Sequence, residues 1–198
     1  MTTTEHVEIV TDPVVAPAIA DVAAATFPLA CPPTSPPENV AGFIRDKLSA
    51  TRFSDYIASP DSDVLIARDG RRGRIVGYGL VHHIPPTDPD VAAVVTRRPA
   101  SELSKCYVLP ELHAHRIDGR APSHALMQAA LDVAKARRSE VVWLGVNQEN
   151  IRAQRFYEKM GFTRVGVKRF DMGGLVLEHD FVYAQDLDSG QHIQTPGG

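Results

Sequence analysis

The chain has 198 residues, of which 43% are hydrophobic and 23% charged, and its formal net charge is −3. This length and composition predict one globular domain with a sizeable core. The small negative charge gives no electrostatic basis for binding nucleic acid or an anionic membrane surface. No apolar run reaches the length of a membrane span, residues 1–20 carry no signal-peptide pattern, and two cysteines are too few for a disulfide framework. We therefore expect a cytoplasmic protein with no membrane or nucleic-acid partner.

Helices and hairpins are predicted in the first half of the chain. A short strand at 7–10 comes first. Helices are expected at 14–26, 38–48 and 50–58, with a proline-rich loop at 29–37 that its prolines keep out of helix. Strands at 64–67 and 74–83 flank Asp69-Gly70, which is a hairpin turn signal. Residues 84–100 read as a long loop.

The second half predicts strand–helix units followed by a hairpin. The expected elements are a strand at 102–109, a helix at 123–137, a strand at 141–146, a helix after the polar turn 147–149, and a hairpin of 162–170 with 175–183. Antiparallel hairpins beside a βαβ core predict a mixed sheet and exclude a simple doubly wound one. We expect one domain, 1–187, and a flexible C-terminal tail, 188–198.

Residues 141–162 organise the chain. The continuous apolar run 141–146 suits a strand that is buried on both faces. After the polar turn, one helical stripe recurs at offsets of three, four and seven, formed by Ala153, Phe156, Tyr157 and Met160. The helix N-terminus therefore lies beside the end of the strand, a common place for a ligand in α/β folds.

The same stretch carries a family resemblance. Its pattern Asn150-x-x-Ala153-x-x-Phe156-Tyr157-x-Lys159-x-Gly161-Phe162 resembles the second half of a GCN5-related N-acetyltransferase (GNAT). The resemblance implies the GNAT acyl-CoA N-acyltransferase fold, an α/β fold with a mixed central sheet flanked by helices. It also implies acetyl-CoA as cosubstrate and an amine as acceptor. The alternative is a generic βαβ segment whose aromatic residues only pack in the core.

A phosphate-binding loop is implied between the strand 102–109 and the helix 123–137. The family loop reads Gln/Arg-x-x-Gly-x-Gly/Ala, and its backbone N–H groups hold the CoA pyrophosphate. Read literally, this pattern fits Arg116, Gly119 and Ala121, but the helix then begins two residues late. In the other register, His113 replaces the Gln/Arg and the loop bulges. Both registers place the phosphates over 113–123, and the residues implied there are His113, Arg116, Gly119, Arg120, Ala121 and Ser123.

The resemblance also implies where the pantetheine arm of CoA binds. In the family the sheet opens at the end of the strand, here Tyr107, Val108 and Leu109, whose backbone pairs with the arm as an added strand would. Asn150 is expected to hydrogen-bond the arm from the facing helix. Alternatively Asn150 caps that helix, a role for which Asn147 competes.

Tyr157 matches the family tyrosine that points at the CoA sulfur, so the resemblance implies that it is the general acid. Glu102 is the candidate general base, because burial on the central strand should raise its pKa. Glu102 can instead be a structural carboxylate paired with Lys105 or Arg98. Adjacent His82 and His83 are further candidates, of which at most one can face a site. No spacing resembles a set of metal ligands.

Four further segments resemble the bacterial spermidine/spermine (PaiA-like) acetyltransferases. They lie at 102–111, 143–146, 170–173 and 179–182. This subgroup implies a polyamine acceptor, held by carboxylates such as Glu102, Asp171 and Asp180. The alternatives are acetylation of a protein N-terminus or another small amine, and a degenerate acyl-CoA-binding domain without catalysis. A homodimer stays open.

Overall fold

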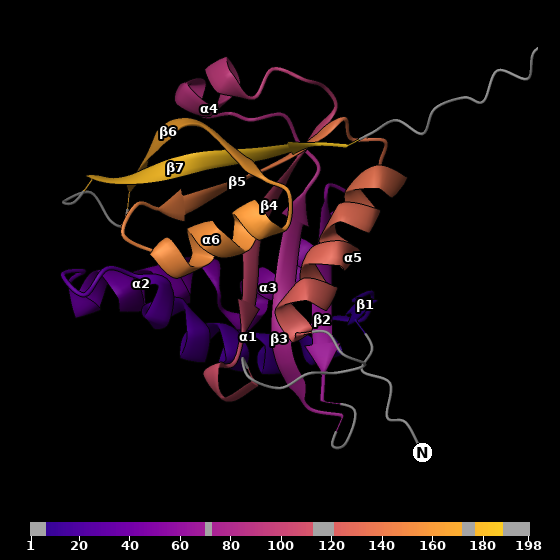
Figure 1. Ribbon diagram of the computed structural model, residues 1–198. Coiled ribbons are helices and arrows are strands. Elements are labelled where there is room, and N and C mark those ends of the chain that lie inside the picture. Colours follow the sequence, from indigo (N-terminus) through magenta and orange to yellow (C-terminus); the bar gives the residue numbers. More distant parts are fainter. Residues whose placement is uncertain (1–6, 70–72, 113–120, 172–176, 188–198) are drawn as a thin grey trace, which may run out of the picture.

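The computed structural model describes residues 7–69, 73–112, 121–171 and 177–187. Within them, a seven-stranded sheet has helices on both faces (Figure 1). The strands, in the spatial order β1-β2-β3-β4-β5-β7-β6, are β1 (Val7–Ile9), β2 (Ser62–Arg68), β3 (Ile75–His82), β4 (Ala100–Val108), β5 (Val141–Asn147), β6 (Thr163–Asp171) and β7 (Leu177–Asp186). The α-helices are α1 (Ala16–Thr26), α2 (Pro37–Lys47), α3 (Ala50–Ala58), α4 (Pro89–Val94), α5 (Pro122–Ala136) and α6 (Ile151–Lys159). Short 3-10 helices are η1 (Pro13–Val15), η2 (Phe27–Ala30) and η3 (Pro110–Leu112).

The sheet is mixed, as the sequence predicted. Its neighbours pair antiparallel at every step except one, the parallel pair of β4 with β5. That pair follows from the connection through α5, which returns the chain to the same end of the sheet. The expected tail 188–198 lies outside the described residues.

The two faces of the sheet are covered by different helices. Adjacent residues of a strand point to opposite faces. On β3, a Cβ at Gly77 would lie 3.0 Å from Leu126 of α5, whereas the ring of Tyr78 lies 5.4 Å from Phe53 of α3. Helix α5 therefore covers one face and α3 the other. Both layers belong to one core, in which Phe53 and Leu126 are fully buried.

Helix α4 is the main departure from the predicted elements, because it lies in the segment expected to be a loop. Asp88 caps it by accepting hydrogen bonds from the N–H groups of Asp90 (2.8 Å) and Val91 (3.4 Å). Val91 is fully buried in a second hydrophobic cluster with Trp143 and Val182. Six residues are too few to display a helical period, so only the Asp-Pro start signal was present in the sequence.

The N-terminal helical run is longer and more apolar than we predicted from the sequence. Pro13–Ala30 has the length and mean hydropathy (1.5) of a membrane-crossing helix, contrary to our expectation that no run reaches that length. In the structure the run comprises η1, α1 and η2, and Ile19 and Ala23 of α1 are fully buried in the main core. Length and composition alone do not distinguish such a core helix from a membrane span.

Candidate active site

A cavity opens where β4 and β5 part. The two strands pair only over Ala100–Glu102 and Val141–Trp143, although β4 continues to Val108 and β5 to Asn147. Figure 1 shows them diverging beyond that point. The space between them is a cavity of about 640 Å³, within the usual range for a small-molecule site. Its walls come from β4, β5, the start of α6 and the segment 26–32.

Several of the residues expected to bind the cosubstrate line this cavity. Tyr107 and Val108 of β4, Ser123 of α5 and Asn150 before α6 all line it. Leu109 does not; it is buried and its N–H donates to the carbonyl of Val76 at 2.8 Å. Ala121 is the N-cap residue of α5. Of the other predicted loop residues, His113, Arg116, Gly119 and Arg120 lie outside the described part of the chain.

The turn before α6 is held by its own side chains. Asn150 caps α6, because its Oδ1 accepts the N–H of Ala153 at 3.1 Å. Asn147 instead accepts the N–H of Glu149 at 2.8 Å, which closes the preceding turn. The buried amide of Gln154 donates to the carbonyls of Asn147 and Gln148. Asn150 is thus the helix cap and a cavity residue together, with its amide NH₂ left to serve a ligand.

Tyr157 lines the cavity from α6. Its ring packs near Phe156 and Phe162, at centroid distances of 5.6 and 6.1 Å. Its hydroxyl makes no hydrogen bond to another described residue. Burial raises its pKa well above the usual value, and the nearby Cys106 and Tyr107 add to the rise. The hydroxyl is therefore protonated throughout the neutral range.

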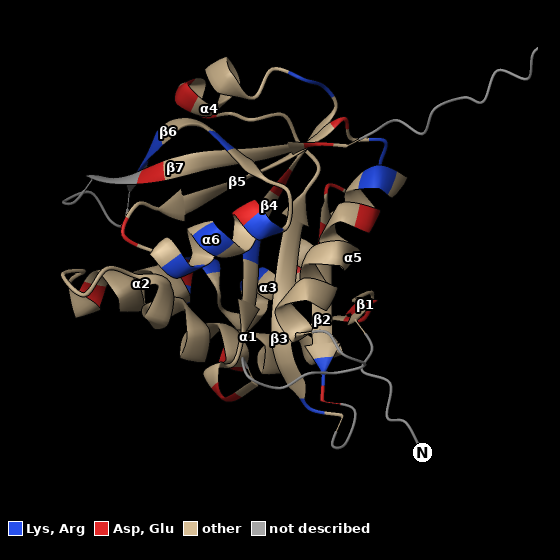
Figure 2. Ribbon diagram, in the orientation of Figure 1, with Lys and Arg blue, Asp and Glu red and all other residues tan. Residues whose placement is uncertain are grey.

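The opposite end of the cavity holds charges of both signs. Glu102 and Lys105 line it from β4, and Lys168 and Asp180 from β6 and β7. Figure 2 shows Lys and Arg on β6 close to an acidic residue of β7. Burial raises the pKa of Glu102, which Lys168 and Lys105 oppose. Burial lowers the pKa of Lys105 to about 8, which the charge of Glu102 opposes.

Gly145 lets Lys168 reach the cavity. A Cβ on Gly145 would lie 2.5 Å from Cε of Lys168 and 3.3 Å from Oδ2 of Asp180. The ammonium group of Lys168 then lies 5.6 Å from the ring centroid of Trp143. Lys168 was missed by the sequence reading, because it comes to this site only through the cross-strand pairing of β6, β7 and β5.

Comparisons with known proteins identify the family. A model described as "Acetyltransferase (GNAT) family" matches residues 25–162. Uncharacterized N-acetyltransferases of Mycobacterium tuberculosis and Mycobacterium bovis are 43% identical over 169 residues, which cover 85% of this chain and 96% of each relative. The chain belongs to the GNAT family. It is therefore an acetyltransferase that uses acetyl-CoA, and the resemblance of the α6 segment is confirmed.

Solved structures agree on the GNAT fold. The PaiA N-acetyltransferase of Thermoplasma acidophilum in complex with coenzyme A has a TM-score of 0.64 at 19% identity, covering 92% of this chain and 99% of its own. The ribosomal-protein-S18-alanine N-acetyltransferase of Escherichia coli has a TM-score of 0.63 at 14% identity, covering 97% and 99%. At these identities the likeness establishes the fold alone. It does not identify the acceptor of this GNAT enzyme.

The described residues fit acetyl-CoA. The parted edge of β4 and the cavity beside it can take an extended arm along Tyr107 and Val108. Helix α5 begins at Pro122 without a side-chain cap, and the N–H groups of His124 and Ala125 donate to the carbonyl of Ala121, so the N–H of Ser123 is left for an anion in this first turn. Ser123, in that first turn, lines the cavity. These features match the two ends of the expected cosubstrate site.

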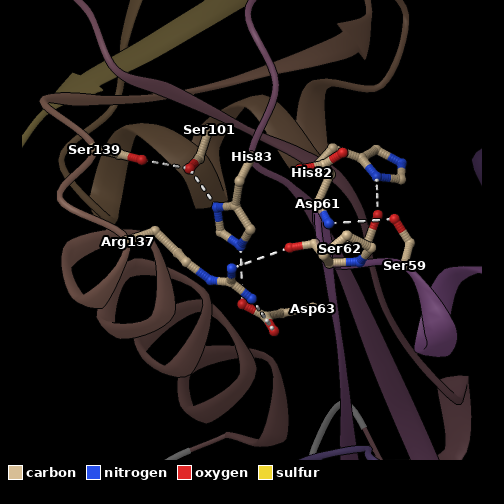
Figure 3. A network of polar contacts seen from close by, with 10 residues as sticks. Ser59, Asp61, Ser62, Asp63, His82, His83, Ser101, Arg137 and Ser139 are labelled. Carbon is tan, nitrogen blue, oxygen red and sulfur yellow. Dashed lines mark hydrogen bonds and ion pairs between the residues drawn. The ribbon is translucent and has the colours of Figure 1, made fainter.

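His82 at the end of β3 and the following His83 make polar contacts away from the cavity (Figure 3). His83 contacts the hydroxyl of Ser101 through Nδ1 at 2.7 Å and the carboxylate of Asp63 through Nε2 at 2.9 Å. Ser101 is 2.6 Å from the hydroxyl of Ser139, and Arg137 forms an ion pair with Asp63 at 3.3 Å. Ser101 is fully buried, so this Asp–His–Ser arrangement is closed to a substrate.

Arg98 and Lys105, the two partners suggested for Glu102, form their hydrogen bonds with other groups. Arg98 donates to the carbonyls of Val95 and Arg97 instead of to Glu102. Lys105 donates to the carbonyl and hydroxyl of Ser104 at 2.9 and 3.2 Å. Among the described residues, Glu102 has no ion pair within 4 Å, although the charges of Lys105 and Lys168 act on it.

Proposed function

We propose that this enzyme transfers the acetyl group of acetyl-CoA to a primary amine by direct attack, with acetyl-CoA lying between β4 and α6. The parting of β4 and β5 after Glu102 and Trp143 carries the proposal, because it creates a cavity beside an open strand edge. The pantetheine arm pairs with β4 near Tyr107 and Val108 and accepts a hydrogen bond from the amide of Asn150.

The pyrophosphate end is proposed at the N-terminus of α5. The N–H and hydroxyl of Ser123, with the positive end of the α5 dipole, suit an anion there. The roles of His113, Arg116, Gly119 and Arg120 stay predictions from the sequence.

Tyr157 is the proposed general acid. As the tetrahedral intermediate collapses, the C–S bond breaks, and the phenol proton passes to the departing thiolate of CoA. A free thiol has a pKa near 8.5, so the thiolate needs only modest help at neutral pH. The raised pKa of Tyr157 keeps this proton in place until it is needed.

Glu102 is the proposed general base. It lines the cavity, its pKa is raised by burial, and its carboxylate has no ion pair within 4 Å to another described residue. An acceptor enters as an ammonium ion and must lose a proton before its nitrogen can attack. A carboxylate with a raised pKa is better suited to take that proton, directly or through water, than an exposed one.

The PaiA-like segments make a polyamine one candidate acceptor. Its support is that Glu102 and Asp180 both line the cavity. A protein N-terminus and other small amines are the alternatives. A cytoplasmic location goes with the proposal, since acetyl-CoA is an intracellular metabolite.

The test combines calorimetry with acetyl-CoA and a thiol-release assay over amine acceptors. We expect saturable cofactor binding and turnover with at least one amine. Tyr157→Phe should lower kcat by roughly ten- to a thousand-fold at an unchanged Kd for acetyl-CoA. The control is Tyr183→Phe, whose hydroxyl donates to Glu158 at 3.1 Å outside the cavity. Absence of cofactor binding at millimolar concentration would overturn the proposal, and full activity of Tyr157→Phe would remove Tyr157 from the mechanism.

A further inference from the structure

Glu102 and Lys105 of β4 carry opposite charges and line the cavity, and neither forms an ion pair within 4 Å with a described residue. The carboxylate of Glu102 makes no hydrogen bond or ion pair to another described residue. The ammonium group of Lys105 donates to the carbonyl and hydroxyl of Ser104 and lies 5.6 Å from the ring centroid of Phe43. Within the described residues, no carboxylate oxygen comes within 4 Å of it. Since partly buried charges are normally paired, both groups are set to receive a charged ligand.

A β-bulge puts these two side chains on the same face. Residues 102 and 105 would point to opposite faces in a regular strand, because their separation is odd. The register with β3 shifts, so that Glu102 lies opposite His82 while Lys105 lies opposite Leu80, which leaves Ser104 as the extra residue. His82 and Leu80 are two residues apart and share a face. Glu102 and Lys105 are therefore neighbours on that face, with Cα atoms about 7 Å apart.

The charged side chains of the cavity are two acidic and two basic ones at this end, so it has no excess of negative charge that would select a polycation. Asp180 and Lys168 are cross-strand partners of β7 and β6, and both line the cavity with Glu102 and Lys105. A polyamine would bring several ammonium groups against the two lysines, and such like-charge contacts disfavour a ligand. A ligand with one positive and one negative group meets opposite charges at both ends.

We propose that the acceptor is an amino acid, with its amine at Glu102 and its carboxylate bound by Lys105. The inference rests on the proposed acetyl transfer and names its substrate class. The amine and carboxylate of an amino acid are a few bonds apart, which suits two side chains that are neighbours on one strand face. The amine then loses its proton to Glu102 and attacks the acetyl carbonyl, while the carboxylate stays bound to Lys105 as an anchor.

Acceptor pairs that differ only in the carboxylate test this assignment. Thiol release is measured with alanine against alaninamide, and with 4-aminobutyrate against 1,4-diaminobutane, in which a protonated aminomethyl group replaces the carboxylate. A charge-assisted hydrogen bond is worth about 1.5–3 kcal/mol, so kcat/KM should favour the carboxylate member by about ten- to a hundred-fold. Lys105→Met should abolish this preference mainly through KM. The control is Lys135→Met, which changes an exposed lysine of α5.

A binding measurement separates this inference from the proposed reaction. Alanine is titrated into the CoA-loaded protein by calorimetry, with Lys105→Met as the comparison. Saturable binding that the substitution weakens at least about tenfold supports the amino-acid site even when turnover is slow. Turnover that is equal for both members of each pair, or faster with diamines, overturns the acceptor class and leaves acetyl transfer standing. Undetectable alanine binding also overturns it, whereas failure of acetyl-CoA binding overturns the proposed function.

Discussion

Substitution of Gly77 tests how closely β3 packs against the end of β4 that is proposed to bind the cosubstrate. A Cβ at this position would lie 2.8 Å from the carbonyl oxygen of Tyr107, 2.9 Å from Cγ2 of Val108 and 3.0 Å from Cδ1 of Leu126. One of these atoms belongs to backbone and cannot swing away. Gly77→Ala therefore requires the end of β4 to shift by a few tenths of an ångström.

Gly79 provides the matched control, because it lies on the same strand and the same face. Its added Cβ would meet Cβ and Cδ1 of Leu65 at 3.5 Å and the carbonyl oxygen of Lys105 at 3.7 Å, which are ordinary contacts. Gly→Ala without strain stabilises a protein by about 0.4–1 kcal/mol through the unfolded state. Both variants have this gain, but overpacking at Gly77 costs about 1–3 kcal/mol, so Gly77→Ala should be less stable than Gly79→Ala by roughly 1–3 kcal/mol.

Thermal unfolding measures the difference. For a domain of this size, 1 kcal/mol corresponds to about 2–4 °C, so Gly77→Ala should melt about 3–10 °C below Gly79→Ala. Because Tyr107 and Val108 line the cavity, Gly77→Ala should also weaken acetyl-CoA binding, and Gly79→Ala should not. Equal melting temperatures for the two variants would show that β4 and β3 are not in this close contact.

Two further predictions concern neighbouring side chains. The pKa of His82 is lowered to about 4, first by burial and then by Lys105 and His83, so its neutral form is favoured in the folded state. Stability from this group is complete above the unfolded pKa of about 6.5 and is lost as the pH falls toward 4, by at most about 3 kcal/mol and less because the ring is partly exposed. His82→Gln should flatten the dependence of the melting temperature on pH over that interval; an unchanged slope would assign the loss to other groups. Gly145→Ala should displace the flexible end of Lys168, raising the acceptor KM while the Kd for acetyl-CoA and the melting temperature change little; a large loss of stability would mean that Lys168 cannot move.

The sequence predicted those parts of the enzyme that depend on local pattern. The apolar run of β5 and the stripe of α6 are properties of neighbouring residues, and the structure has both. The cap at Asn150 was one of two alternatives that the sequence left open. The role of the segment 26–32 as a cavity wall was not predicted, since it depends on how η2 lies against β4. Lys168 reaches the cavity through three strand pairings, and the bulge at Ser104 carries no glycine or proline that would mark it.

The point at which the sheet opens is determined by the network beside it. Ser101 is the middle residue of the short β4–β5 pairing, and its hydroxyl joins His83 of the β3 side to Ser139, just before β5. The backbone adds a bond from the N–H of Glu140 to the carbonyl of Pro99 at 2.7 Å. These contacts hold both strands together up to Glu102. Beyond it, β4 no longer pairs with β5 and borders the cavity, along which an added strand can lie. Glu102 is thus the last residue of β4 that pairs with strands on both sides, which gives its carboxylate a defined position on the wall of the cavity.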